Sequence, residues 1–282
     1  MAPAQDNWSS ETYQHSASFV PKLATKVVQW LDPQPGDVIL DIGCGDGILS
    51  VDIASTVSQI GGKLVGLDSS GAMIKAAKKM AESKGLPSEK CAFDVADATN
   101  ITPSTLVPAG GFNKIFSNAA IHWILTPEDT RVKFFDDVHG LLAPGGKFVF
   151  ECGGRGNIAE IRAAFLAVIG RMVGFEKAKE ACPWFFPDEE WMNGVMTEEK
   201  GWIIEKIELE HRPTKVDKGG VEGWVRLMGR SWFNVMGVEG ESEQREDAVK
   251  EATKVLEEVC RDPNRIGWRL EYVRLRVVAR KI

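Results

Sequence analysis

The stretch "ILDIGCGDGILSVDIA", residues 39–54, constrains the fold of this chain more than any other segment. An apolar run leads into three glycines within five positions, and a pattern of helical spacing follows. This order predicts a buried strand, a tight turn and a helix whose first N–H groups lie at the carboxyl edge of a parallel sheet, where α/β folds bind ligands. Because glycine has no Cβ, a ligand can lie directly against its backbone. We therefore expect a ligand at Gly43, Gly45 and Gly47.

The alternation of strand and helix continues along the chain. Strands are expected at 37–42, 63–68, 90–95, 112–117 and 146–152, and helices at 48–58, 70–84, 128–142 and near 102–107. This rhythm predicts a parallel sheet covered by helices on both faces. Two later runs, 202–212 and 268–280, are expected to add strands at its edge. The fold class is therefore α/β, a doubly wound, mostly parallel seven-stranded sheet with a mainly helical cap.

The change of pattern after residue 157 predicts the domain organisation. Residues 1–30 are expected to form an N-terminal helical lid, and 31–174 the ligand-binding core. A cap that binds substrate is expected over 175–267, with one core strand near 202–212 inside it, and 268–282 should return to the sheet. The aromatic residues of this cap either form its own core or line a substrate pocket; they are Trp184, Phe185, Phe186 and Trp191.

Composition and charge limit the function classes. The net charge of −6 argues against a broad nucleic-acid surface, and no apolar run is long enough to span a bilayer. The start has no secretory signal pattern. Five widely spaced cysteines match neither a disulfide framework nor a zinc site. We expect a cytoplasmic protein, a monomer or homodimer with reduced thiols, that binds a small molecule and neither metal, nucleic acid nor membrane.

Spacing within the glycine turn distinguishes between ligands. A dinucleotide fingerprint would need glycine at Ile48, whereas this turn reads D-x-G-x-G-x-G from Asp41 to Gly47. Asp68 ends the next strand, where a carboxylate can accept hydrogen bonds from both hydroxyls of a ribose. Since Asp41 adds a second negative charge, the turn favours a cationic ligand that carries no phosphate.

These residues resemble the class I S-adenosylmethionine-dependent methyltransferases. Further motifs follow in that family's order: "DVADAT", "FNKIFSNAAIHWI" and "LLAPGGKFVF". The resemblance implies that the three glycines pack against the methionine part of S-adenosylmethionine, that Asp68 binds its ribose and that Asp97 faces its adenine, leaving S-adenosylhomocysteine as product. Asp97 can alternatively cap a following helix. The other cofactor-binding residues expected are Tyr13, Asp41, Ser69, Ala98 and Asn118.

A narrower resemblance, to the trans-aconitate methyltransferases and their fungal relatives, rests on "SNAAIHWI", "ECGGRGNI", "HRPT", "EGWVRLM" and "EYVRLRVVARK". It implies methyl transfer to a carboxylate oxygen of a small acid. An ionised carboxylate is already a nucleophile, so such an enzyme needs no general base. It does need cations for the carboxylates that do not react. The candidate substrate-binding residues are Trp123, Arg155, Arg212, Trp224, Arg226, Arg230 and Arg274.

Two alternatives stay open. A secondary-metabolite methyltransferase acting on oxygen, nitrogen, sulfur or carbon would use a histidine base, and His122, after the fourth strand, is the catalytic candidate. His122 is equally compatible with a structural role. A regulatory protein could instead keep the cofactor fold without catalysis. A pocket lined by arginine favours the carboxylate, whereas an apolar pocket with histidine facing the methyl group favours the first alternative.

Overall fold

The computed structural model describes residues 23–101, 108–237, 240, 242–263 and 266–282 of the 282-residue chain. The helix expected near 102–107 lies outside the described residues. So do residues 1–22 of the expected lid, including Tyr13.

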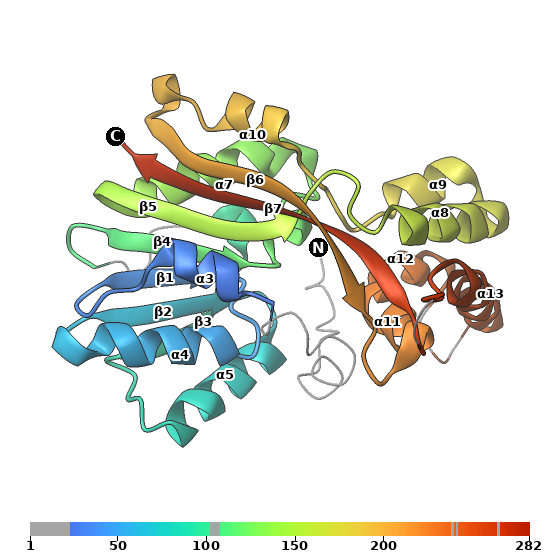
Figure 1. Ribbon diagram of the computed structural model, residues 1–282, viewed down its shortest axis with the longest axis horizontal. Coiled ribbons are helices and arrows are strands. Elements are labelled where there is room, and N and C mark those ends of the chain that lie inside the picture. The colour runs from blue at the N-terminus through green and yellow to red at the C-terminus, as the bar shows by residue number, and fades with distance from the viewer. Residues whose placement is uncertain (1–22, 102–107, 238–239, 241, 264–265) are drawn as a thin grey trace.

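Seven strands form one sheet in the order β3-β2-β1-β4-β5-β7-β6 (Figure 1). The first five run parallel, and β7 is antiparallel to both of its neighbours, β5 and β6. This confirms the predicted fold class. The strands are β1 Val38–Ile42, β2 Lys63–Asp68, β3 Cys91–Val95, β4 Phe112–Asn118, β5 Leu142–Gly153, β6 Trp202–Lys215 and β7 Arg269–Lys281.

The α-helices cover both faces of the sheet and gather at one end of it (Figure 1). They are α3 Thr25–Leu31, α4 Ile48–Val57, α5 Gly71–Ser83, α6 Ile121–Ile124, α7 Arg131–Leu141, α8 Ala159–Val173, α9 Phe175–Glu180, α10 Glu189–Val195, α11 Gly220–Met228, α12 Arg230–Phe233 and α13 Glu243–Val259.

Alternation along β5 divides the core into two layers. Phe148 and Phe150 point to one face, where they pack with α7 and α10, and Val149 points to the other, which α3, α4 and α5 cover. Successive side chains of a strand face opposite sides, so a strand covered on both faces is apolar at nearly every position. Because α3 packs on the sheet, residues 25–31 belong to the core and are not part of a lid.

The expected start of β5 was residue 146, but the strand begins at Leu142. Leu142 pairs with Phe112, and regular pairing resumes only at Lys147 with Lys114. The turn "APGG" is thus a bulge within the ladder, since the extra residues leave the register and then rejoin it.

The cap has its own hydrophobic core. Residues of α8 pack there with residues of α11 and α13, so by packing the cap begins near Ile158, earlier than the expected residue 175. Met192 and Val195 of α10 pack instead with the sheet. Helices α11, α12 and α13 lie between the end of β6 and the start of β7, which extend the sheet toward the cap (Figure 1).

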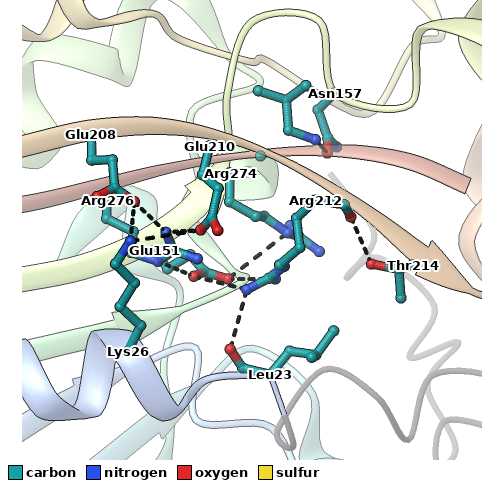
Figure 2. A network of polar contacts seen from close by, with 12 residues as sticks. Leu23, Lys26, Glu151, Asn157, Glu208, Glu210, Arg212, Thr214, Arg274 and Arg276 are labelled. Carbon is teal, nitrogen blue, oxygen red and sulfur yellow. Dashed lines mark hydrogen bonds and ion pairs between the residues drawn. The ribbon is translucent and has the colours of Figure 1, made fainter.

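A buried carboxylate ties β5 to β7 and to the edge strand β6 (Figure 2). Glu151 on β5 is 2% exposed and accepts hydrogen bonds from Arg276 Nε at 2.6 Å and Arg212 Nη2 at 2.9 Å. Arg276 also donates to Glu208 at 2.8 Å and to Glu210 on β6. Breaking a buried pair costs more than forming it gains, because the remaining charge is left unpaired in a poorly solvated site.

Lys26 connects α3 to this network. Its ammonium group lies 2.5 Å from Glu208 Oε1. We name the charged residues that share these contacts the Glu151 network: Lys26, Glu151, Glu208, Glu210, Arg212, Arg274 and Arg276.

Replacing Glu151 by glutamine should lower the free energy of unfolding by ~3–5 kcal/mol, because it removes the buried negative charge that Arg276 and Arg212 share. Urea unfolding followed by circular dichroism measures the change. The matched control is Glu251→Gln, which removes the partner of Arg171 from an exposed ion pair and should cost less than ~1 kcal/mol. Equal losses in the two variants would contradict a structural role for the Glu151 network.

Candidate active site

A cavity of about 640 Å³ lies between the carboxyl ends of the parallel strands and the cap. Ligand sites of this size and position are usual in α/β folds. The predicted site residues that line it are Asp41, Gly43, Gly45, Asp68, Ser69, Asp97, Ala98, Asn118, His122, Trp123, Trp224, Arg230 and Arg274.

The surroundings that favour glycine differ among the three glycine positions of the first turn. All have positive φ, at 74° for Gly43, 56° for Gly45 and 80° for Gly47. A Cβ on Gly43 would lie 2.2 Å from Ala120 Cβ, and one on Gly47 would lie 2.8 Å from Ala77 Cβ. A Cβ on Gly45 would meet no atom within 4 Å beyond its own chain neighbours. Neighbouring protein atoms therefore exclude a side chain at Gly43 and Gly47, and Gly45 alone of the three leaves room for a ligand.

Gly47 lies outside the cavity wall, although the sequence placed it against the ligand. It is the N-cap residue of α4, in a left-handed conformation. Glycine is thus favoured at position 47 by the left-handed backbone at the start of α4.

Asp68 holds the glycine turn in shape. Its carboxylate accepts hydrogen bonds from the backbone N–H of Gly45 and of Ser70, both at 2.9 Å. Asp97 accepts from the backbone N–H and the hydroxyl of Thr99, so it also caps the turn that follows β3. A carboxylate has about four lone-pair sites, so both side chains keep acceptor capacity toward the cavity.

Asp41 is buried at the end of β1. Burial raises the pKa of its carboxyl to about 7, the hydrogen bond from Ser50 opposes the rise, and the charge of Asp68 adds to it. Near neutral pH the group is therefore partly protonated. A cation bound nearby would restore its charge.

Asn118 ends β4, with its side chain in the wall of the cavity. Its Oδ1 is buried and has no hydrogen-bond partner among the described residues. A buried acceptor left unpaired costs ~1–3 kcal/mol. Since Asn118 lines the cavity, a donor on a bound ligand would satisfy it.

His122 is buried on α6, and its Nδ1 accepts a hydrogen bond from the Gly153 N–H at 3.1 Å. Burial lowers the pKa of His122 well below 6.5, and the charge of Arg274 lowers it further. The ring is therefore neutral, and because Nδ1 accepts, the proton lies on Nε2. Such a ring donates a hydrogen bond from Nε2, whereas a general base needs a free lone pair.

Arg274 on β7 brings a buried positive charge to the cavity. Its guanidinium lies 4.5 Å from the centre of the Tyr272 ring, and its Nε is 3.8 Å from Glu151 Oε1. This Nε has no hydrogen-bond partner among the described residues. Only 4% of the surface of Arg274 is exposed. Arg274 is thus a buried cation that can still donate hydrogen bonds, because the described protein groups do not use all of its N–H groups.

Asn157, which the sequence did not single out, is a further donor in the cavity wall. Its Oδ1 accepts from the Val273 N–H at 2.9 Å, which leaves the amide NH₂ to donate. Figure 2 shows Asn157 near Arg274, on the segment that follows β5. Its place just after the fifth strand, within the motif "ECGGRGNI", was the available signal.

Three arginines expected at the substrate site lie elsewhere. Arg155 is 76% exposed and pairs with Asp188 at 3.0 Å. Arg212 belongs to the Glu151 network and lines a separate hollow beside β6. Arg226 pairs with carboxylates of α11 and α13, Glu222 at 2.8 Å and Glu246 at 2.9 Å. Each guanidinium is fixed by a carboxylate outside the cavity, whereas Arg230 does line it.

The aromatic residues of "CPWFFPDEEW" divide between the two expected roles. Trp184 and Phe186 line the cavity, with stacked rings whose centres are 6.1 Å apart. Phe185 and Trp191 pack against the sheet. Successive side chains of residues 184–186 therefore face opposite ways, as along an extended backbone. The Phe185 N–H donates to the His122 carbonyl at 3.0 Å, which ties this segment to α6.

Within the described parts of the chain, no group of three His, Cys, Asp or Glu side chains is arranged to hold a metal ion. Among the helices described above, none has both the length and the apolar character needed to cross a bilayer. The five cysteines are free.

Residues 33–181 match a protein-family model described as a methyltransferase domain. Over 281 residues the chain is 34% identical to an uncharacterized methyltransferase of Schizosaccharomyces pombe, covering 98% of this chain and 99% of the relative. A malonyl-[acyl-carrier protein] O-methyltransferase of Ilyobacter polytropus is 31% identical over 155 residues, 54% of this chain and 52% of the relative. The chain belongs to the class I S-adenosylmethionine-dependent methyltransferases.

Solved structures show the same fold. A Bacillus halodurans methyltransferase structure matches with a TM-score of 0.59 at 14% identity, covering 91% of this chain and 97% of the other. A Geobacter sulfurreducens methyltransferase in complex with S-adenosyl-L-homocysteine matches with a TM-score of 0.50 at 17% identity, covering 92% and 90%.

The tautomer of His122 is directly measurable. Its ring should stay neutral with the proton on Nε2 as the pH falls from neutral to 6.5, since its pKa lies well below 6.5. Nitrogen-15 NMR distinguishes the two tautomers and the charged ring. The variant His122→Gln identifies the resonance by its loss. A titration midpoint near 6.5, or a ring protonated on Nδ1, would contradict the assignment.

Proposed function

We propose that this methyltransferase transfers the methyl group of S-adenosylmethionine to a carboxylate oxygen of a small organic acid. The observation that carries the proposal is the buried guanidinium of Arg274, with unfilled hydrogen-bonding capacity, in a cavity wall that also holds the donors His122 and Asn157. Buried guanidinium groups are suited to carboxylates, which accept two parallel hydrogen bonds from one fork.

Charge is unevenly distributed around the cavity, in support of a cationic cofactor and an anionic acceptor. The carboxylates lie after β1, β2 and β3, whereas the guanidiniums come from β7 and α12. The carboxylates are those of Asp41, Asp46, Asp68 and Asp97, and the guanidiniums are those of Arg230 and Arg274. Opposite charges at two ends of one cavity favour one orientation of the two reactants.

Residues at the strand ends would hold the cofactor. Gly45 leaves open space beside the backbone, the unpaired Asn118 Oδ1 would accept a hydrogen bond, and Asp68 keeps acceptor capacity for the ribose hydroxyls. In the same proposal Asp97 and Ala98 border the adenine, and Asp41 faces the positive end. When bound, S-adenosylmethionine supplies a methyl group on a sulfonium, and the electron pair of the broken bond stays on sulfur.

At the acceptor end, the protein positions an oxygen that is already nucleophilic. A carboxylate of pKa ~4 is ionised at neutral pH, so no proton has to be removed. Arg274 would orient the carboxylate, while the N–H groups of His122 and Asn157 donate to it. This role needs neutral His122 with a proton on Nε2, the form that Gly153 and burial favour. A phenol or amine acceptor would instead need a free lone pair, whereas the lone pair of this tautomer, on Nδ1, already accepts from the Gly153 N–H.

The relatives support the reaction class. The name of one relative, malonyl-[acyl-carrier protein] O-methyltransferase, describes methyl transfer to an oxygen of a malonyl group, which ends in a carboxylate. trans-Aconitate, the acceptor implied by the resemblance of the sequence, belongs to the same class of acids. It is therefore included in the panel of acceptors.

Purified protein with methyl-labelled S-adenosylmethionine should transfer label to a carboxylic acid and form an ester. Mild alkali should release this label as methanol. Phenols, amines and thiols are tested in parallel, and their methylated products are stable to alkali. Label that stays bound after alkali, or transfer to these acceptors alone, would contradict the proposal.

Replacing Arg274 by methionine should lower kcat/KM for the acid about 10- to 100-fold, as expected for loss of a hydrogen bond to a charged group. Cofactor affinity should not change. Glu151 keeps Arg212 and Arg276, so the variant should remain folded. Arg155→Met, at an exposed ion pair outside the cavity, is the matched control and should leave kcat/KM unchanged. Equal effects of the two changes would contradict the role of Arg274.

A further inference from the structure

We infer that the acceptor is an acid with one carboxylate on an apolar body, rather than a small polycarboxylate such as trans-aconitate or citrate. This inference rests on the proposed function and narrows its acceptor. It follows from the side chains that form the acceptor end of the cavity.

The acceptor end is mostly apolar. It is formed by the segment after β4, by the "CPWFFPDEEW" segment and by α11, and its large apolar side chains are Trp123, Trp184, Phe186, Trp224, Leu227 and Met228. Binding sites with such walls gain affinity by removing apolar ligand surface from water.

The polar atom of the Trp224 ring is bonded to Tyr272, another residue of the cavity wall. The indole N–H of Trp224 donates to the Tyr272 hydroxyl at 2.7 Å. Burial raises the pKa of Tyr272 to about 12, so its ring is uncharged. Because the indole N–H is already bonded, Trp224 presents an apolar surface to a ligand.

Cations are too few for a polycarboxylate. Among the described residues that line the cavity, the basic side chains with a permanent charge are Arg230 and Arg274. Arg230 already interacts with another group of the protein. A buried carboxylate needs a paired charge or several hydrogen bonds, and without them it loses more in desolvation than it gains.

A tricarboxylate would bring two unreacted carboxylates besides the one that accepts the methyl group. The arginines expected to hold them, Arg155, Arg212 and Arg226, are paired with carboxylates outside the cavity. Arg274 with the donors His122 and Asn157 suffices for one carboxylate. An apolar body would then lie against the tryptophans and α11.

A homologous series of acids tests this inference on the wild-type chain. The value of kcat/KM should rise about fourfold with each methylene from butanoate to decanoate, until the chain fills the cavity. It should exceed the values for trans-aconitate and citrate. Higher kcat/KM for either polycarboxylate, or no dependence on chain length, overturns the inference while the proposed function stands. Failure of every acid, with cofactor binding demonstrated, overturns the proposed function itself.

A substitution in the apolar wall tests whether this wall contributes to binding of the apolar body of the acid. Met228 is half-buried and lines the cavity, and glutamine has nearly its size and shape. Met228→Gln should lower kcat/KM for decanoate several-fold more than that for butanoate. The matched control is Val255→Gln on α13, at a position 44% exposed, which should alter neither. Equal losses on both acids in Met228→Gln would overturn the inference.

Discussion

Glu151, a buried carboxylate in the fifth strand, connects the edge of the sheet with the acceptor end of the cavity. It lies opposite Arg276 in the β5–β7 ladder, and Arg276 lies opposite Glu208 in the β6–β7 ladder. Residues at alternate positions of a strand share a face, so Arg274 stands on the same face as Arg276, two positions nearer the cap. The contacts that fix the antiparallel strand therefore also fix the side chain that we propose binds the acceptor.

The regular strands and helices of the ligand-binding core could be predicted from the sequence because their signals are local. The apolar runs at 38–42 and 63–68 are short, bounded by turns and followed by helical periodicity. Where the outcome depends on distant partners, the prediction was less accurate. Helix α8 is the next helix after the fifth strand, but its apolar residues pack against the distant helices α11 and α13, which begin at Gly220 and Glu243.

The same distinction separates the site residues that were placed correctly at the cavity from those that were not. Asp41, Asp68 and Asn118 end parallel strands, and the carboxyl ends of such strands meet at one edge, so topology alone brings them together. A distant carboxylate partner of an arginine leaves no local signal. Only the folded chain places Asp188 beside Arg155 and Glu246 beside Arg226, although Glu222 is also a local partner of Arg226, one helical turn away.

Even the glycine motif, the strongest signal in the sequence, combines two causes that the sequence cannot separate. Gly43 and Gly47 make room for Ala120 and Ala77, whereas Gly45 faces open space. A motif that serves both packing and binding looks the same as one that serves binding alone. The positive φ at all three positions further obscures the difference, because glycine is favoured there whatever lies nearby.

The charges around Glu151 support the proposal that the acceptor is an anion. Among the described residues, the Glu151 network holds four cations and three carboxylates. Arg276 and Arg212 donate to Glu151, whereas Arg274 reaches it only at 3.8 Å. Folding thus leaves one buried guanidinium incompletely compensated, and it is the one that borders the cavity. A bound carboxylate would supply the missing counter-charge, so the energetic cost of burying Arg274 in the free protein would favour binding of the acid.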